Sequence, residues 1–462
     1  MCTIKGESNS KTRMANSKTH ISPWLWVPTL YFTEGIPYFL VNSISVMLFA
    51  KMGVPNDQLS FFTTLLYFPW FLKGLWSPFV DILRTKRWWI IAMQILMTAL
   101  CILLTVTLPH PDAATIADKA TSAGTFRFTL ILFIIAAFAS ATHDIAADGY
   151  YMLAHDQKSQ AAFVGIRSTF YRIAAIFSQG VLVYIAGVVE KNTFDPETQM
   201  GNIPLSWQVT LGATSVILLL VTIYHCFFLP RAAEDQPRET TDYHGAMREL
   251  GESFATFFTK PGVGLAIAFM LLYRLSEGFL VKLSQPFLVD NRLVSMRDGL
   301  IIGGGLQLST DTVGLLYGTI GVICLLLGGI LGGIYISRHG LKRSIWLMAA
   351  ALTLPSFVYC YLSMAQPESL WIIGTAVSFE QFGYGFGFTA YMMYMMHFSE
   401  GKYKTAHYAI CTAFMALSMM IPGFVAGSIE MAVGYAPFFW IANACSITTF
   451  IITYFVYKNL KS

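Results

Sequence analysis

Twelve stretches of this chain are long and apolar enough to cross a lipid bilayer. A membrane-spanning helix needs about twenty consecutive, mostly apolar residues. The stretches cover residues 24–50, 59–80, 88–108, 127–152, 160–189, 207–229, 261–289, 311–336, 344–364, 370–396, 405–430 and 436–457. Only 12% of the residues are charged, whereas about a quarter are charged in ordinary soluble domains. The sequence therefore predicts an all-α membrane protein with twelve transmembrane helices.

The longest polar interruption, residues 230–260, separates six apolar stretches from six others. Its second half carries apolar side chains at helical spacing, which is typical of an amphipathic helix on a membrane surface. We therefore predict two pseudo-symmetric six-helix halves. The predicted segments are a disordered cytoplasmic tail (1–22), an N-terminal bundle (23–229), a cytoplasmic linker (230–260), a C-terminal bundle (261–457) and a cytoplasmic tail (458–462).

The Lys and Arg residues between the stretches fall mainly on one side of the predicted membrane. Alternate segments, such as 81–87, 230–260 and 337–343, are rich in them, and the segments between are poor. Lys and Arg bias short loops toward the cytoplasm. The pattern predicts a multi-pass protein of the inner, or cytoplasmic, membrane with both termini in the cytoplasm. No basic stripe lies outside these loops, so we expect no nucleic-acid partner.

The short basic loop between the second and third stretches recurs in the second half of the chain. In the first copy Asp81 stands where the helix leaves the membrane, and in the second copy Ser337 takes its place. The spacing resembles the loop between helices 2 and 3 of major facilitator transporters. A chain that carries this loop twice is predicted to be a duplicated half-bundle. The residues predicted to act in gating are Asp81, Arg84, Lys86, Arg87, Arg338, Lys342 and Arg343.

Charged side chains lie inside several of the apolar stretches. Each costs about 2.5–3.5 kcal/mol at the bilayer centre on insertion scales, so each needs a partner or a water-filled cavity. Asp144 and Asp148 share one helix face by their spacing, and Glu34 lies beside Gly35 and Pro37. We predict a central proton and solute site built from these acids and an Arg, because burial and a nearby cation compete to set proton affinity. The residues predicted to bind solute or protons are Glu34, Lys73, Asp144, Asp148, Tyr171, Arg172, Arg274, Glu277, Glu380, Tyr391 and Tyr394.

Three short pieces of the first half form a recognisable set. They are residues 34–37, residues 73–81 with Gln94 after them, and residues 140–148. Together they resemble the AmpG-like permeases, the muropeptide and acetyl-CoA transporter branch of the major facilitator superfamily. The resemblance implies the major facilitator fold and a transported small molecule. It also implies important roles for Lys73, Asp81, Asp144 and Asp148.

The predicted function is secondary active transport, by proton-coupled symport, of a small sugar-containing solute such as a muropeptide-like amino sugar or a disaccharide. The two halves would rock about a midplane site to give alternating access, and the flat faces and hydroxyl groups of Tyr suit a sugar ring. We expect a monomer whose partners are the solute, protons and the bilayer. We expect no cofactor and no bound metal.

Two alternatives belong to other functional classes. His143, where the family more often has Gln, stands five residues before Asp148, which matches the spacing of an acyltransferase motif. No phosphate-binding partner motif accompanies it, so the prediction is a transporter and not an enzyme. A non-transporting sensor of the same fold is the second alternative.

Overall fold

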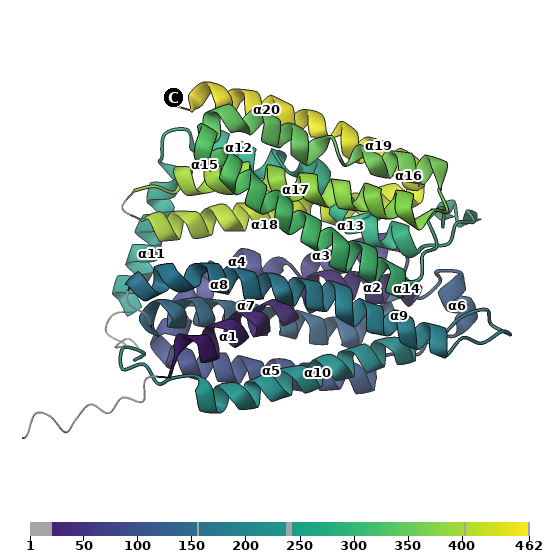
Figure 1. Cartoon of the computed structure of the whole chain (residues 1–462), viewed down its shortest axis with the longest axis horizontal. Helices are drawn as coiled ribbons and strands as arrows, with labels where there is room; N and C mark the ends of the chain where they lie inside the picture. The colour runs from purple at the N-terminus through teal and green to yellow at the C-terminus, as the bar shows by residue number, and fades with distance from the viewer. Residues whose placement is uncertain (1–20, 155–156, 237–242, 402, 461–462) are drawn as a thin grey trace, which may run out of the picture.

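The protein is a bundle of long helices that lie side by side along one axis (Figure 1). This computed structural model describes residues 21–154, 157–236, 243–401 and 403–460. In Figure 1 the helices of the first half, coloured purple to teal, form one layer, and the helices of the second half, coloured green to yellow, lie above them. The predicted all-α class is confirmed. The predicted tail 1–22 falls almost entirely outside the described residues.

The first half begins with a long helix that changes its pitch. Pro37 lies inside α1, where it removes one backbone hydrogen-bond donor, and the π-helical segment η1 follows directly. The elements of this half are α1 (Pro23–Phe39), η1 (Leu40–Ile44), α2 (Ser45–Lys51), α3 (Asn56–Leu65), α4 (Phe68–Leu83), α5 (Lys86–Thr107), α6 (Ala113–Ala117), η2 (Ala123–Phe126), α7 (Arg127–Ala154), α8 (Gln157–Ile176), η3 (Phe177–Leu182), α9 (Val183–Asn192) and α10 (Ile203–Phe228).

Helix α11 (Tyr243–Phe258) connects the halves at one end of the bundle (Figure 1). Its Phe257 is fully buried and packs against Phe398 and Phe414 of the second half. The elements that follow are α12 (Val263–Leu272), α13 (Leu275–Val289), the hairpin strands β1 (Ser295–Arg297) and β2 (Leu300–Ile302), α14 (Thr310–Val313), η5 (Gly314–Gly321), α15 (Val322–Thr353), α16 (Phe357–Ala365), α17 (Leu370–Phe398), α18 (Lys404–Val433), α19 (Tyr435–Ala444) and α20 (Ser446–Asn459).

Nine helical segments among the described residues are long and apolar enough to cross a membrane. The longest, Thr310–Ala365, covers two predicted spans and is broken at Gly340, whose φ of 76° belongs to the region that favours glycine. The predicted spans 59–80 and 370–396 are also helical, as α3–α4 and α17, but they are not among the nine. The outer faces of the helices expose large apolar side chains, such as Val106, Leu220 and Ile447, as contact with lipid requires. The count of twelve spans stays a prediction.

The two halves are packed tightly at the end opposite α11, which we call the far end. The π-helical segments η3 and η5 meet here, and Gly318 lies so close to η3 that an added Cβ would be 1.8 Å from the carbonyl oxygen of Gln179. Lys191 of the first half also pairs with Asp311 of the second, at 2.6 Å. Direct contact between backbones therefore seals the far end.

We expect Gly318→Ala to weaken this seal. The added methyl group would overlap a backbone carbonyl, so the halves would have to separate locally, and overpacking of this kind costs roughly 1–3 kcal/mol. The variant should show a lower apparent melting temperature in detergent and slower solute exchange. Gly333→Ala is the matched control, because nothing lies within 4 Å of its added Cβ. Equal behaviour of the two variants would contradict a tight seal at Gly318.

Candidate functional site

A cavity of about 430 Å³ lies between the two halves. Most of its wall comes from the first half and includes Tyr31, Glu34, Tyr38, Tyr67, Trp70, Lys73, Ser140, Asp144, Arg167, Ser168 and Tyr171, while α18 of the second half supplies Thr412, Met415 and Ala416. Pockets for small molecules usually measure about 300–1,000 Å³. The cavity is therefore large enough for a small solute that touches both halves.

Two ion pairs stand in and beside the cavity. Lys73 of α4 donates to Asp144 Oδ2 at 2.5 Å. Arg167 of α8 contacts Asp148 Oδ1 at 2.6 Å, and its guanidinium lies 4.6 Å from the centre of the Tyr31 ring. Because α7 carries both aspartates four residues apart, one helix face presents both to different cations.

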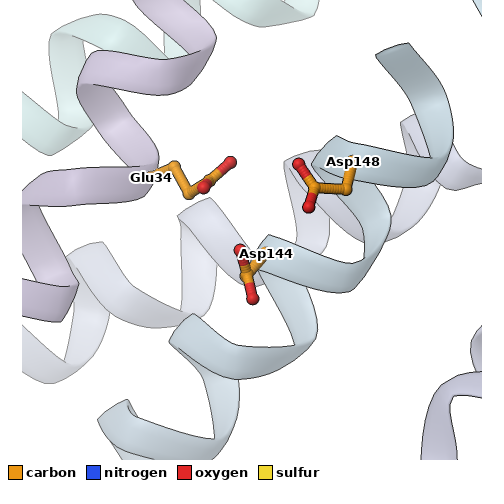
Figure 2. Close-up of side chains that lie close together, drawn as sticks. All are labelled: Glu34, Asp144 and Asp148. Atoms are coloured by element: carbon orange, nitrogen blue, oxygen red, sulfur yellow. The ribbon is translucent and has the colours of Figure 1, made fainter. Parts of the chain in front are cut away.

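Glu34 of α1 is a third carboxylate, and no ion pair reaches it among the residues that the structure describes. Figure 2 shows it facing Asp144 and Asp148 from the neighbouring helix. Oxygen atoms of the three carboxylates lie within 4.8 Å of one another. Glu34 is only 6% exposed, and its Oε2 has no hydrogen-bond partner among the described residues. The site thus holds three carboxylates against two cations, and Glu34 carries the unmatched charge.

This donor set fits a proton better than a metal ion. Three clustered carboxylates are a common cation-binding arrangement, but Lys73 and Arg167 already occupy Asp144 and Asp148 at hydrogen-bonding distance. A divalent ion would have to displace the ammonium or the guanidinium to reach two of its three ligands. A single proton on Glu34 balances the charge without displacing either group.

The site is more exposed toward the α11 end than away from it. The side chain of Asp148, which lies toward the Ala154 end of α7, is 36% exposed, while that of Asp144, one turn deeper, is 17% exposed. Glu34 is nearly buried. Exposure of the three carboxylates therefore decreases away from the α11 end.

The structure brings Glu34, Lys73, Asp144, Asp148 and Tyr171 together, as the sequence predicts. The arginine at the site differs from the one predicted: Arg167 binds Asp148, whereas Nε of Arg172 contacts Ser168. Arg172 also lies near Gly329 of α15, so it faces the other half rather than the carboxylates.

The predicted site residues of the second half do not line the cavity. Arg274 makes a two-pronged ion pair with Glu277, at 2.9 and 3.0 Å, and donates to the Tyr384 hydroxyl at 2.8 Å. Tyr391 donates to the carbonyl oxygen of Met270. Glu380 is buried and accepts from Gln381, and Tyr394 packs against Phe269. These contacts account for the polar groups of Arg274 and Tyr391 inside the second half.

The predicted gating residues lie at the α11 end, but the first loop binds its own half. Asp235 accepts from the backbone N–H groups of Lys86 and Arg87, where it caps α5. The Arg87 side chain donates to the carbonyl oxygens of Leu229 and Cys226. The Asp81 side chain lies outside the described part of the structure. In the second loop, Arg343 and Lys342 line a separate cavity of about 900 Å³ with His339 and Glu400. A gating role for these residues stays a prediction.

A second polar group in the first half was not predicted. Gln94 contacts both His143 and His225, at 3.0 and 2.9 Å, and His225 contacts Thr29 at 2.9 Å. All but Thr29 are buried below 2% exposure. These hydrogen-bonded side chains connect α1, α5, α7 and α10. This arrangement points His143 into the helix bundle and away from the cavity.

Solved structures with a similar shape define the fold. A bacterial homolog of the human lysosomal transporter Spinster, in an inward-facing conformation, has a TM-score of 0.65 at 13% identity and covers 96% of this chain and 97% of that one. The D-xylose-proton symporter has a TM-score of 0.66 at 14% identity and covers 93% and 96%. This chain has the major facilitator fold.

Relatives in sequence narrow the class. A family model described as acetyl-coenzyme A transporter 1 matches residues 24–250. The anhydromuropeptide permease of Escherichia coli K12 is 23% identical over 430 residues, covering 92% of this chain and 77% of the permease. Putative transporter AmpG 4 of Rickettsia conorii is 21% identical over 440 residues, covering 94% and 95%. The resemblance to AmpG-like permeases is confirmed, and so is the prediction of a transporter rather than an enzyme.

Proposed function

We propose that the protein imports a small sugar-containing solute together with a proton across the inner membrane, with both termini in the cytoplasm. The observation that carries the proposal is the unmatched carboxylate of Glu34, which shares the cavity with two ion pairs. A buried, unpaired carboxylate is costly. Protonation removes the cost, so proton binding and the state of the cavity are coupled.

The wall chemistry favours a saccharide. Five aromatic side chains, from Tyr31, Tyr38, Tyr67, Trp70 and Tyr171, border the cavity beside the charged groups. Flat apolar faces pack against sugar rings, and Tyr hydroxyl groups and carboxylates bond sugar hydroxyls. The names of two similar proteins, an anhydromuropeptide permease and a D-xylose-proton symporter, agree with this class of solute. We propose a muropeptide-like amino sugar or a disaccharide.

The sealed far end supports alternating access. A transporter of this fold exposes a midplane site to one side at a time by rocking its halves. Here the halves touch through backbone at the far end, and the cavity is reached from the α11 end. With α11 in the cytoplasm, this is an inward-facing arrangement.

A proteoliposome uptake screen tests the proposal. The panel contains amino-sugar disaccharides, anhydro-muropeptides, plain disaccharides and coenzyme A esters, each with and without an inward proton gradient. We expect accumulation of one sugar-containing class that a protonophore abolishes. Uptake of coenzyme A esters alone, accumulation that ignores the gradient, or no uptake of any compound would each contradict the proposed function.

A further inference from the structure

A buried polar cluster bridges the two halves at the sealed far end. We call it the outer cluster, and its members are Asn56 on α3, Lys119 between α6 and η2, Asp290 at the end of α13, Glu430 on α18 and Tyr435 on α19. All five side chains belong to buried residues. The first two members come from the first half and the other three from the second, so the cluster forms only when this end is closed.

Lys119, the cation of the outer cluster, forms an ion pair with Asp290. Lys119 Nζ donates to Asp290 Oδ2 at 2.5 Å and to Asn56 Oδ1 at 2.9 Å. The Tyr435 hydroxyl also donates to Asp290 Oδ2, at 2.7 Å. Oδ2 of Asp290 therefore accepts from both the ammonium group and the Tyr435 hydroxyl. Nothing in this set of contacts neutralises Glu430.

Glu430 and Asp290 both contact the side-chain amide of Asn56. Asn56 Nδ2 donates to Glu430 Oε2 at 2.8 Å and lies 3.3 Å from Asp290 Oδ2. Glu430 is 1% exposed, and no ion pair reaches it among the described residues. The two acids thus converge on one nitrogen atom, with one ammonium group between them.

In the described part of the chain, the surroundings of Glu430 include no cation besides Lys119. The charged and titratable groups that face it from the elements packed around it are Asp57 on α3, Lys119 before η2, Asp290 on α13 and Tyr435 on α19. Arg297 of β1, which lies nearby, donates to the backbone carbonyl oxygens of Asp118 and Lys119. Closing this end therefore buries more negative than positive charge, which is unfavourable unless one acid is neutral.

We propose that Glu430 is a second proton-binding site, separate from the central cavity, and that it takes up a proton when the far end closes. The proposal rests on the proposed alternating access but not on proton coupling at Glu34. When the halves separate, water surrounds Glu430 and it ionises. When they close, a proton from the solution at that end neutralises it, and the proton returns there on reopening. The site therefore makes closure pH-dependent without itself moving a proton across the membrane.

The sign of the pH dependence follows from the count of protons. The closed state binds one proton more than the open state, so acid favours closure. A one-proton difference changes the ratio of closed to open molecules by up to about tenfold per pH unit. The ratio changes over the pH range between the proton affinity of Glu430 in the open state and its proton affinity in the closed state.

Distance measurements between spin labels in lipid nanodiscs test the proposal without solute or gradient. Labels at Glu197→Cys and Trp371→Cys stand on exposed positions of the two halves at the far end, in a background with the exposed Cys226 replaced by Ser. We expect short distances near pH 5 and a growing long-distance population toward pH 9. A distribution that does not change with pH overturns the proposal.

Three variants identify the group responsible. Glu430→Gln and Asp290→Asn each leave one acid to pair with Lys119, so closure no longer needs a proton. The distance between the labels should therefore stay short across the pH range in both variants. Lys119→Met removes the cation and should move closure to lower pH. Glu368→Gln, an exposed acid at the same end, should keep the wild-type response. If Glu430→Gln does not fold, Asp290→Asn makes the same test, and a wild-type pH response in either acid variant overturns the proposal. Because no transport is measured, failure here leaves the proposed function untouched.

Discussion

Glu34→Gln is expected to abolish proton-driven accumulation of the solute while leaving solute exchange largely intact. Among the described residues no ion pair reaches Glu34, and its Oε2 has no hydrogen-bond partner, so glutamine removes the proton-binding group without leaving a cation unpaired. Counterflow exchange needs no net proton movement. Accumulation under an inward proton gradient should fall to the level of protonophore-treated vesicles, while exchange should stay within about threefold of wild type, a difference of less than 1 kcal/mol.

The conservative variant is the control for this prediction. Glu34→Asp keeps a carboxyl group in the cavity and should restore part of the accumulation. Asp148→Asn should behave differently, because it leaves Arg167 without its partner and is expected to impair both activities. Normal accumulation by Glu34→Gln would remove Glu34 from the coupling mechanism, and Asp148 would become the next candidate.

Lys73→Met is expected to cause the largest loss of stability at the site. In the wild-type protein Lys73 Nζ donates to Asp144 Oδ2 at 2.5 Å. The substitution leaves Asp144 without this cation and beside a second carboxylate. Breaking a fully buried pair costs roughly 3–5 kcal/mol. The Lys73 side chain is 32% exposed, so we expect a smaller loss of about 2 kcal/mol, together with loss of uptake. The apparent melting temperature in detergent measures the first effect.

The double variant separates charge pairing from transport. Lys73→Met with Asp144→Asn removes both charges at once, so the melting temperature should return most of the way to wild type. Uptake should stay lost, because both groups line the solute cavity. A double variant no more stable than Lys73→Met alone would show that the pair does not stabilise the fold through its charge.

The helical architecture follows directly from the apolar stretches. Hydrophobic length alone predicts where helices cross a membrane, and every predicted span is mainly helical in the structure, with breaks in 59–80, 261–289, 344–364 and 436–457. The spacing of Asp144 and Asp148 likewise predicts a shared face, and both do meet Glu34. These are local properties of one helix, which is why sequence patterns carry them.

Contacts between helices were harder to predict. Arg167 and Arg172 lie five residues apart on α8 and so point in different directions, but the sequence does not show which direction is inward. The outer cluster was not predicted, because Lys119 lies in the polar segment between two apolar stretches and Asp290 directly follows another, and solvated charges are common at both kinds of position. Their partnership depends on how the two halves close, and residues this far apart in sequence carry no local signal of it.

Solute-driven proton movement is the most direct test of the central claim. Proteoliposomes holding the wild-type protein and a pH-sensitive dye inside are given the transported solute outside, with no imposed gradient. Adding solute should acidify the interior in proportion to uptake, and the same vesicles with Glu34→Gln should show no acidification. Uptake by the wild-type protein with no change in internal pH would contradict proton-coupled symport through the Glu34 site.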